Sequence, residues 1–206
     1  MSFEGWIIFT LFWAVFVTTP GPNAVNCIQN GMEFGFRKSL WGVLAILTQA
    51  TCFLILSALG VTALILASPT AFTSVQVIGA LVLVVLGIRG WLNASKPVSV
   101  TPQNGRSIYF KALAIATINA KSVAGYLAAF SQFVQVDVPI WNQMGVLMPT
   151  ALTLTALSYM GYTAIGSGLG KMALGAVLNQ WFRRGMAVCF VIYGTLMGAA
   201  TLQGRA

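Results

Sequence analysis

The sequence predicts an all-α integral membrane protein with six transmembrane helices, arranged as two inverted three-helix repeats. Its 206 residues are 58% hydrophobic and only 7% charged. Soluble proteins carry roughly 25% charged residues, so this chain has too few charged side chains to cover a surface in water. Charge-free stretches recur along the chain that are long enough to cross a bilayer, which takes about 20 apolar residues.

The expected spans divide into two halves within a single membrane domain. The charge-free run 39–88 is too long for one span, and Pro69 within it cannot continue a helix, so we place a turn there. The polar, proline-rich stretch 93–107 links a first repeat of about 1–92 to a second repeat of about 108–206. The spans are expected near 5–29, 40–66, 71–92, 109–134, 142–166 and 184–203.

Positive charges predict the orientation. The loops after the first, third and fifth spans, with their margins, hold nine Lys and Arg residues, and the opposite side holds only Arg205. Cytoplasmic loops are rich in Lys and Arg, so both termini are expected outside the cytoplasm. These loops account for the net charge of +8, and no nucleic-acid partner is expected. A re-entrant first segment would leave five spans, and the sequence leaves that alternative open.

Few side chains are available for acid–base chemistry or for binding a metal. There is no histidine, and the acids are Glu4, Glu33 and Asp137. A Ser-His-Asp triad and a histidine-ligated zinc site are therefore excluded. No carboxylates lie close enough in sequence to suggest a glycosidase pair, and there is no Walker motif. We expect neither an enzyme nor a bound cofactor or metal.

The first span contains a run that a transmembrane helix rarely tolerates, Pro20-Gly21-Pro22-Asn23. The prolines remove two backbone donors and favour local unwinding. Irregular backbone at membrane depth is stable only inside protein or beside a cavity. We expect a discontinuous helix whose second half begins at Asn23, with its positive N-terminal end facing an anionic group. A simple proline kink is the alternative.

The fourth span contains Asn119 and Lys121. A lysine this deep in an apolar helix costs about 3 kcal/mol on insertion scales. Snorkelling of the ammonium to the interface would lower that cost, but we expect a functional role. Because Lys121 is the only deep ionisable residue, the expected coupling ion is a proton. Sodium held by the carbonyls freed around Pro20–Pro22 remains the alternative.

The two unusual sites lie in corresponding places of the two halves. Thr19 and Asn23 align with Thr117 and Lys121, 98 positions later. Three helices per half, with a broken or polar first helix in each, are typical of inverted-repeat transporters, which bind substrate near the midplane. The candidate substrate-binding residues lie at these sites or on neighbouring faces: Pro20, Gly21, Pro22, Asn23, Gln49, Asn119, Lys121 and Gln132.

The same residues resemble a known family. Thr19-Pro20-Gly21-Pro22-Asn23, followed by Gly35 and Gly42, resembles the N-terminal signature of the LysE/RhtB amino-acid exporters. Asn119-Ala120-Lys121 and Gln132-Phe133-Val134 resemble the fourth-helix motif of that family, which usually has proline at the positions of Ala120 and Ser131. The resemblance implies a multi-pass exporter of amino acids or their derivatives in the bacterial inner (plasma) membrane.

Two functional hypotheses follow. The first is a secondary-active exporter of a neutral amino acid, because no acid lies between Glu33 and Asp137 to balance a cationic substrate side chain. The second is a non-transporting helical scaffold or accessory subunit. The hydroxyls of Thr155, Tyr159 and Tyr162 either line a cavity or bond to neighbouring helices. The expected partners are the substrate and the lipid bilayer. We assign the GxxxG pairs Gly31/Gly35, Gly166/Gly170 and Gly194/Gly198 to close helix packing, and they also permit a homodimer.

Overall fold

The computed structural model describes residues 2–67, 69–96, 108–119, 122, 125–126, 131–135, 137–170, 172 and 179–203. Every regular element in this part of the chain is an α-helix. The helices are α1 (Phe3–Thr18), α2 (Pro22–Ala67), α3 (Pro69–Leu92), α4 (Ile108–Ile118), α6 (Ile140–Leu169) and α8 (Gln180–Gln203). The expected all-helical class is therefore confirmed.

Three stretches are long and apolar enough to cross a membrane, among the residues that the structure describes. They are Pro22–Gly60, Ile140–Leu169 and Arg183–Gln203, and shorter apolar helices cover Phe3–Thr18, Gln76–Leu92 and Ile108–Ile118. These helices fall within or overlap the expected spans. Most of the expected linker 93–107 lies outside the described residues.

The break expected in the first span is present. The helix α1 ends at Thr18, because Thr19 is extended with φ −66° and ψ 121°. The helix α2 begins at Pro22, where a missing N–H costs nothing since first-turn amides have no partner within the helix. A second irregularity at Gly35 (φ 71°, ψ 171°) divides α2 into a first arm, 22–34, and a second arm, 36–67.

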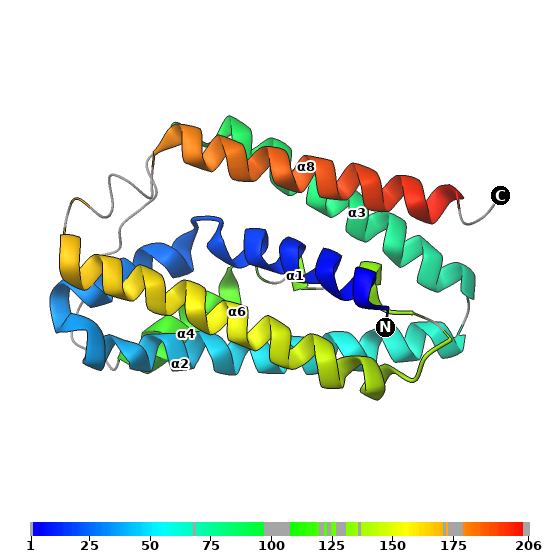
Figure 1. The fold of residues 1–206 in the computed structure, drawn as a ribbon, viewed down its shortest axis with the longest axis horizontal. Coiled ribbons are helices and arrows are strands. Elements are labelled where there is room, and N and C mark those ends of the chain that lie inside the picture. Colours follow the sequence, from blue (N-terminus) through cyan, green and yellow to red (C-terminus); the bar gives the residue numbers. More distant parts are fainter. Residues whose placement is uncertain are drawn as a thin grey trace.

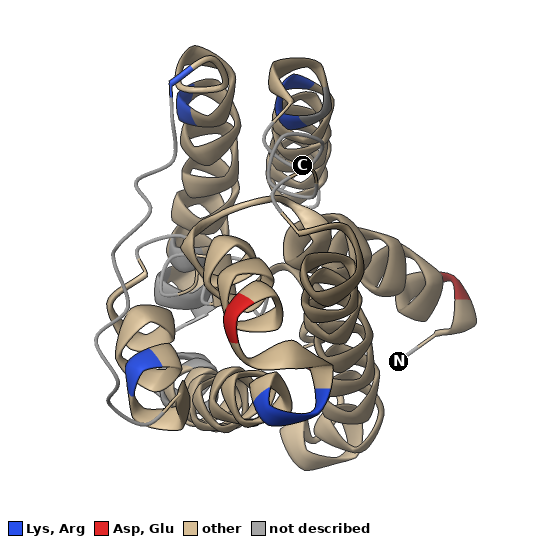
Figure 2. Cartoon of the chain, turned by 90° about the vertical axis from the view of Figure 1, so that its left-hand side faces the viewer, with Lys and Arg blue, Asp and Glu red and all other residues tan. Residues whose placement is uncertain are grey.

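The helices form an elongated bundle with both termini at the same end (Figure 1). The two arms of α2 run in opposite directions after the bend at Gly35. The helix α6 packs along α1 and α2, and α4 packs on α2. The helices α3 and α8 pack on each other as a pair beside this group. Lys and Arg gather on the helix ends at the left-hand side of that view, which Figure 2 shows end-on.

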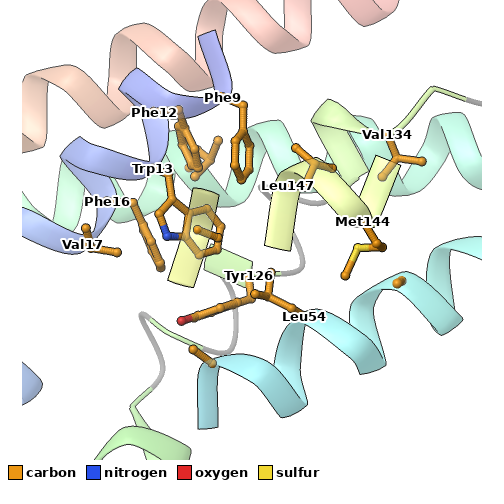
Figure 3. Packing of buried hydrophobic residues seen from close by; sticks show 14 of the residues in the cluster. Phe9, Phe12, Trp13, Phe16, Val17, Leu54, Tyr126, Val134, Met144 and Leu147 are labelled. Atoms are coloured by element: carbon orange, nitrogen blue, oxygen red, sulfur yellow. The ribbon is translucent and has the colours of Figure 1, made fainter. Parts of the chain in front are cut away.

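An aromatic cluster from α1 joins the helices around it (Figure 3). Trp13 lies edge-on to Tyr126 of the fourth span, with ring centroids 5.1 Å apart. Phe16 lies edge-on to Phe190 of α8, at 6.2 Å. A Cβ placed on Gly125 would lie 2.2 Å from the Phe16 ring, so a larger residue here would displace that ring. The cluster fixes α1 at the centre of the bundle.

The GxxxG pairs have two different roles. A Cβ on Gly31 would meet the Thr163 carbonyl oxygen at 2.3 Å, and one on Gly194 would meet the Ala80 carbonyl oxygen at 2.8 Å, so these glycines allow close helix packing within the chain. Gly35 and Gly170 instead have positive φ, and a Cβ on either would have no neighbouring atom within 4 Å. For these two, the expectation of packing is wrong, because they turn the chain at helix ends. A homodimer stays a prediction.

Candidate functional site

The carbonyl end of the helix break is covered by hydroxyls from α6. Pro22 has no N–H to bond the Thr18 carbonyl, and the Tyr162 hydroxyl donates to that oxygen instead. The Ser158 hydroxyl donates to the Val17 carbonyl at 3.1 Å. The Thr19 hydroxyl donates to the Val15 carbonyl at 2.6 Å. The backbone carbonyls of Val17 and Thr18, at the end of α1, are thus hydrogen-bonded by side chains of α6.

The other side of the break faces a cavity of about 330 Å³. The cavity lies between the break and the α3–α8 pair, and Arg89 and Arg183 are among the residues that line it. The positive end of the α2 helix dipole is at the same place, so the cavity suits an anionic group. Its lining residues are Thr19, Pro20, Gly21, Pro22, Leu86, Arg89, Gly90, Asn93, Arg183, Ala187 and Phe190.

The two arginines have different surroundings. Arg183 donates to the backbone carbonyls of Asn93, Ala94 and Lys96 at 2.7–2.8 Å, so it binds the carboxyl end of α3 to the start of α8. Asn93 donates to the backbone carbonyl of Arg89, but the Arg89 guanidinium makes no hydrogen bond to the described residues. Arg183 therefore holds the wall of the cavity in place, whereas Arg89 is available to a ligand. Neither arginine was among the residues predicted for the site, because in the sequence both count only as charges at the membrane margin.

Near the break, three amide side chains of α2 lie buried in the bundle. Asn23 and Asn26 are each 3% exposed, and Gln49 is 2% exposed. The side-chain oxygen and nitrogen of Asn26 and of Gln49 have no hydrogen-bond partner among the described residues. The same is true of Oδ1 of Asn23. The Asn23 side chain approaches the hydroxyl of Tyr159 on α6. We call Asn23, Asn26 and Gln49 the amide cluster.

Helix register places Asn23 and Gln49 at a similar depth along the bundle. A Cβ on Gly42 would lie 3.0 Å from Nδ2 of Asn30, which fixes how the two antiparallel arms face each other. Asn23 lies seven residues, or two helical turns, before Asn30 on the first arm. Gln49 lies seven residues after Gly42 on the second arm, which runs in the opposite direction. Gly42 also faces Ala112 of α4, and seven residues beyond Ala112 is Asn119. The packing thus places Asn23 and Gln49 at about one level, and α4 ends just before Asn119.

The remaining predicted residues are placed differently. Gln132 donates its amide to the backbone carbonyl of Gln76, so it anchors the fourth span to α3. Lys121 lies outside the described residues. Thr155, in the expected hydroxyl stripe, bonds the Ala151 carbonyl at 2.6 Å and accepts from the Trp13 indole at 3.1 Å. Thr155 therefore links α6 to α1 through its hydrogen bond with Trp13.

The sequence of the chain is similar to those of known proteins. A family model described as LysE type translocator matches residues 14–200. A protein of Vibrio cholerae serotype O1, described as an uncharacterized membrane protein, is 34% identical over 174 residues, which are 83% of this chain and 85% of the relative. The homoserine/homoserine lactone efflux proteins of Salmonella typhimurium and Salmonella typhi are each 24% identical over 204 residues, 97% of this chain and 98% of theirs.

No solved structure matches the chain. The matched family covers the helix break, the cavity and the amide cluster in one continuous stretch. The apolar helices make the chain a membrane protein, and the family makes it a transporter and not an enzyme. With nearly its whole length matched, the chain belongs to the LysE type translocator family.

Proposed function

We propose that this protein is a secondary-active exporter of neutral amino acids or their derivatives in the bacterial inner membrane. The observation that carries the proposal is the helix break at Thr19–Gly21, which opens onto a cavity holding Arg89. The names of the Salmonella relatives support efflux of compounds related to amino acids. Family membership gives no support to the alternative of a non-transporting scaffold.

In this proposal the substrate carboxylate binds at the break. The first-turn amides of α2 lack partners within the helix, and the helix dipole adds the equivalent of about half a positive charge. Arg89 supplies a guanidinium, which can hold a carboxylate through two parallel hydrogen bonds. Pro20 and Gly21 contribute by keeping the backbone out of the helix, Pro22 begins α2, and Asn23 lies in the first turn, which faces the carboxylate.

The charges around the site favour a substrate with a neutral side chain. Glu4, Glu33 and Asp137 are all exposed at the surface of the structure. A cationic side chain taken into the bundle would therefore lack a carboxylate partner among the described residues, and burying an unpaired charge is costly. Amino acids with uncharged side chains avoid this cost.

The packing also supports six spans in two inverted repeats. The helix α4 ends at Ile118 and Asn119 is not helical, which parallels the end of α1 before its break. The helix α1 packs on α6, and α4 packs on α2, where Gly42 of the second arm faces Ala112. A twofold axis between the two repeats would exchange α1 with α4, α2 with α6, and α3 with α8. The α1–α6 contact then corresponds to the α4–α2 contact, and the α3–α8 contact corresponds to itself. Lys121, near the second break, is proposed to carry the coupling proton.

The test is transport in proteoliposomes that contain the purified protein. We expect homoserine to be transported and lysine to be excluded. Arg89→Gln should lower homoserine transport at least tenfold but leave homoserine lactone transport largely unchanged, because the lactone has no carboxylate. Arg37→Gln, at an exposed position beside the bend of α2, is the matched control. Absence of transport for any amino acid, or equal effects of both substitutions, would contradict the proposal.

A further inference from the structure

The amide cluster differs from Gln143, another buried amide in the described part of the bundle. The Gln143 side chain is 1% exposed and makes three hydrogen bonds of 2.7–2.8 Å, to the backbone of Gln135 and Val138. Asn26 and Gln49 are buried to the same degree and make none among the described residues. Burying an amide without a partner costs free energy, so native proteins rarely leave one unsatisfied unless it has a ligand or water to bind.

Beside the amide cluster lies the hydroxyl of Tyr159, which the Asn23 side chain approaches and which leaves Asn26 and Gln49 without a partner among the described residues. The buried hydrophobic cluster that the two arms share includes apolar side chains such as Ala24, Val43 and Ile46. The hydroxyls of α6 nearest the break are committed elsewhere, because Ser158 and Tyr162 bond the end of α1. The unpartnered atoms thus have to be satisfied from outside the described protein.

The unpartnered atoms include both kinds of hydrogen-bonding group. Oxygen acceptors are present on Asn23, Asn26 and Gln49, and amide donors are present on Asn26 and Gln49. A bare cation would use only the oxygens and a bare anion only the nitrogens, so either would leave atoms unsatisfied. A hydroxyl or a carboxamide both donates and accepts, and it brings no charge into a region without a counter-charge.

We propose that the amide cluster is the subsite for the substrate side chain, and that it selects side chains bearing a hydroxyl or a carboxamide. The subsite rests on the proposed function, which places the substrate carboxylate at the start of α2. Asn26 lies one helical turn beyond Asn23, or roughly 4.5 Å along the axis. That distance is comparable to the reach of a two- or three-carbon side chain whose α-carboxylate lies at the break.

The test compares homoserine with norvaline, which has a methyl group in place of the hydroxyl. In proteoliposomes, the unsubstituted protein should prefer homoserine at least tenfold. Asn26→Leu and Gln49→Leu should each remove most of this preference, while norvaline is still transported. Arg89→Gln should lower transport of both amino acids to a similar extent, because both have the carboxylate.

Stability measurements separate a binding role from a structural one. Asn26→Leu and Gln49→Leu should leave the thermal unfolding midpoint unchanged or raise it, since neither loses a hydrogen bond. Gln143→Leu, the matched control, should lower it by several degrees. The subsite is overturned if the preference survives in Asn26→Leu and Gln49→Leu, or if these unfold as early as Gln143→Leu. Transport without any preference in the unsubstituted protein would overturn the subsite alone, whereas no transport at all would overturn the proposed function.

Discussion

The contact between α6 and the first arm of α2 depends on Gly166. A Cβ at this position would lie 2.3 Å from the carbonyl oxygen of Ile28 and 2.8 Å from its Cα. Both atoms belong to the backbone, so no side-chain rotation can relieve the contact. Ordinary contacts between carbon and oxygen begin near 3.3 Å, and Gly166→Ala therefore requires the two helices to separate by about 1 Å.

The size of the effect follows from this displacement. Overpacking of a close contact typically costs about 1–3 kcal/mol. Alanine also stabilises a helix relative to glycine by up to about 1 kcal/mol, which partly offsets the cost. Gly161 lies on the same helix, and a Cβ there would have no neighbouring atom within 4 Å. Gly161→Ala therefore gains the helix propensity of alanine without the cost of overpacking. The difference between the two variants isolates the packing cost.

The assay is thermal unfolding of both purified variants in the same detergent. For a chain of this length, 1 kcal/mol corresponds to roughly 2–4 °C, so Gly166→Ala should unfold about 2–12 °C below Gly161→Ala. Gly166→Ala should also transport more slowly, because the displaced arm carries Asn23 and Asn26. Equal unfolding temperatures for the two variants would refute the close crossing at Gly166.

Two further predictions concern the breaks. Tyr162→Phe and Ser158→Ala each leave a carbonyl at the end of α1 without its donor, so each should cost about 1–3 kcal/mol of unfolding free energy. Ser167→Ala, whose hydroxyl only bonds within its own helix, should be nearly neutral, and equal losses in all three would contradict the capping role. Lys121→Met keeps length and apolarity, so it should fold normally and stop transport; a normal rate with unchanged pH dependence in proteoliposomes would exclude Lys121 as proton carrier.

The helix break was predictable because its cause is local. Pro20 and Pro22 remove backbone donors wherever the span lies, and the structure interrupts the helix there. The position of Arg89 at the cavity was not predictable, since it depends on α3 lying beside the break, and a single sequence holds no record of that contact. Asn26 did leave a readable signal, because Asn23, Asn26 and Asn30 repeat at helical spacing in an apolar stretch.

Spacing alone also misassigned two glycines. Gly31 and Gly35 form one GxxxG pair, yet only Gly31 contacts a neighbouring helix. The motif reports that two residues share a helix face, and it assumes that the helix continues through both. Gly35 has φ 71°, which ends the first arm before the motif is complete. The same local freedom that makes glycine suitable for close packing makes it suitable for the turn, so the sequence cannot separate the two uses.

The two ends of the first break differ in a way that limits where a coupling ion can bind. The carbonyls of Val17 and Thr18 already accept hydrogen bonds from α6, so a cation bound there would have to displace Ser158 and Tyr162. The amide end faces a cavity with Arg89, which repels a cation and attracts a carboxylate. The break therefore suits a carboxylate better than sodium, which supports the proposal that ion coupling depends on a different residue. Lys121, in the corresponding part of the second half, is the residue on which the proposal of proton coupling depends.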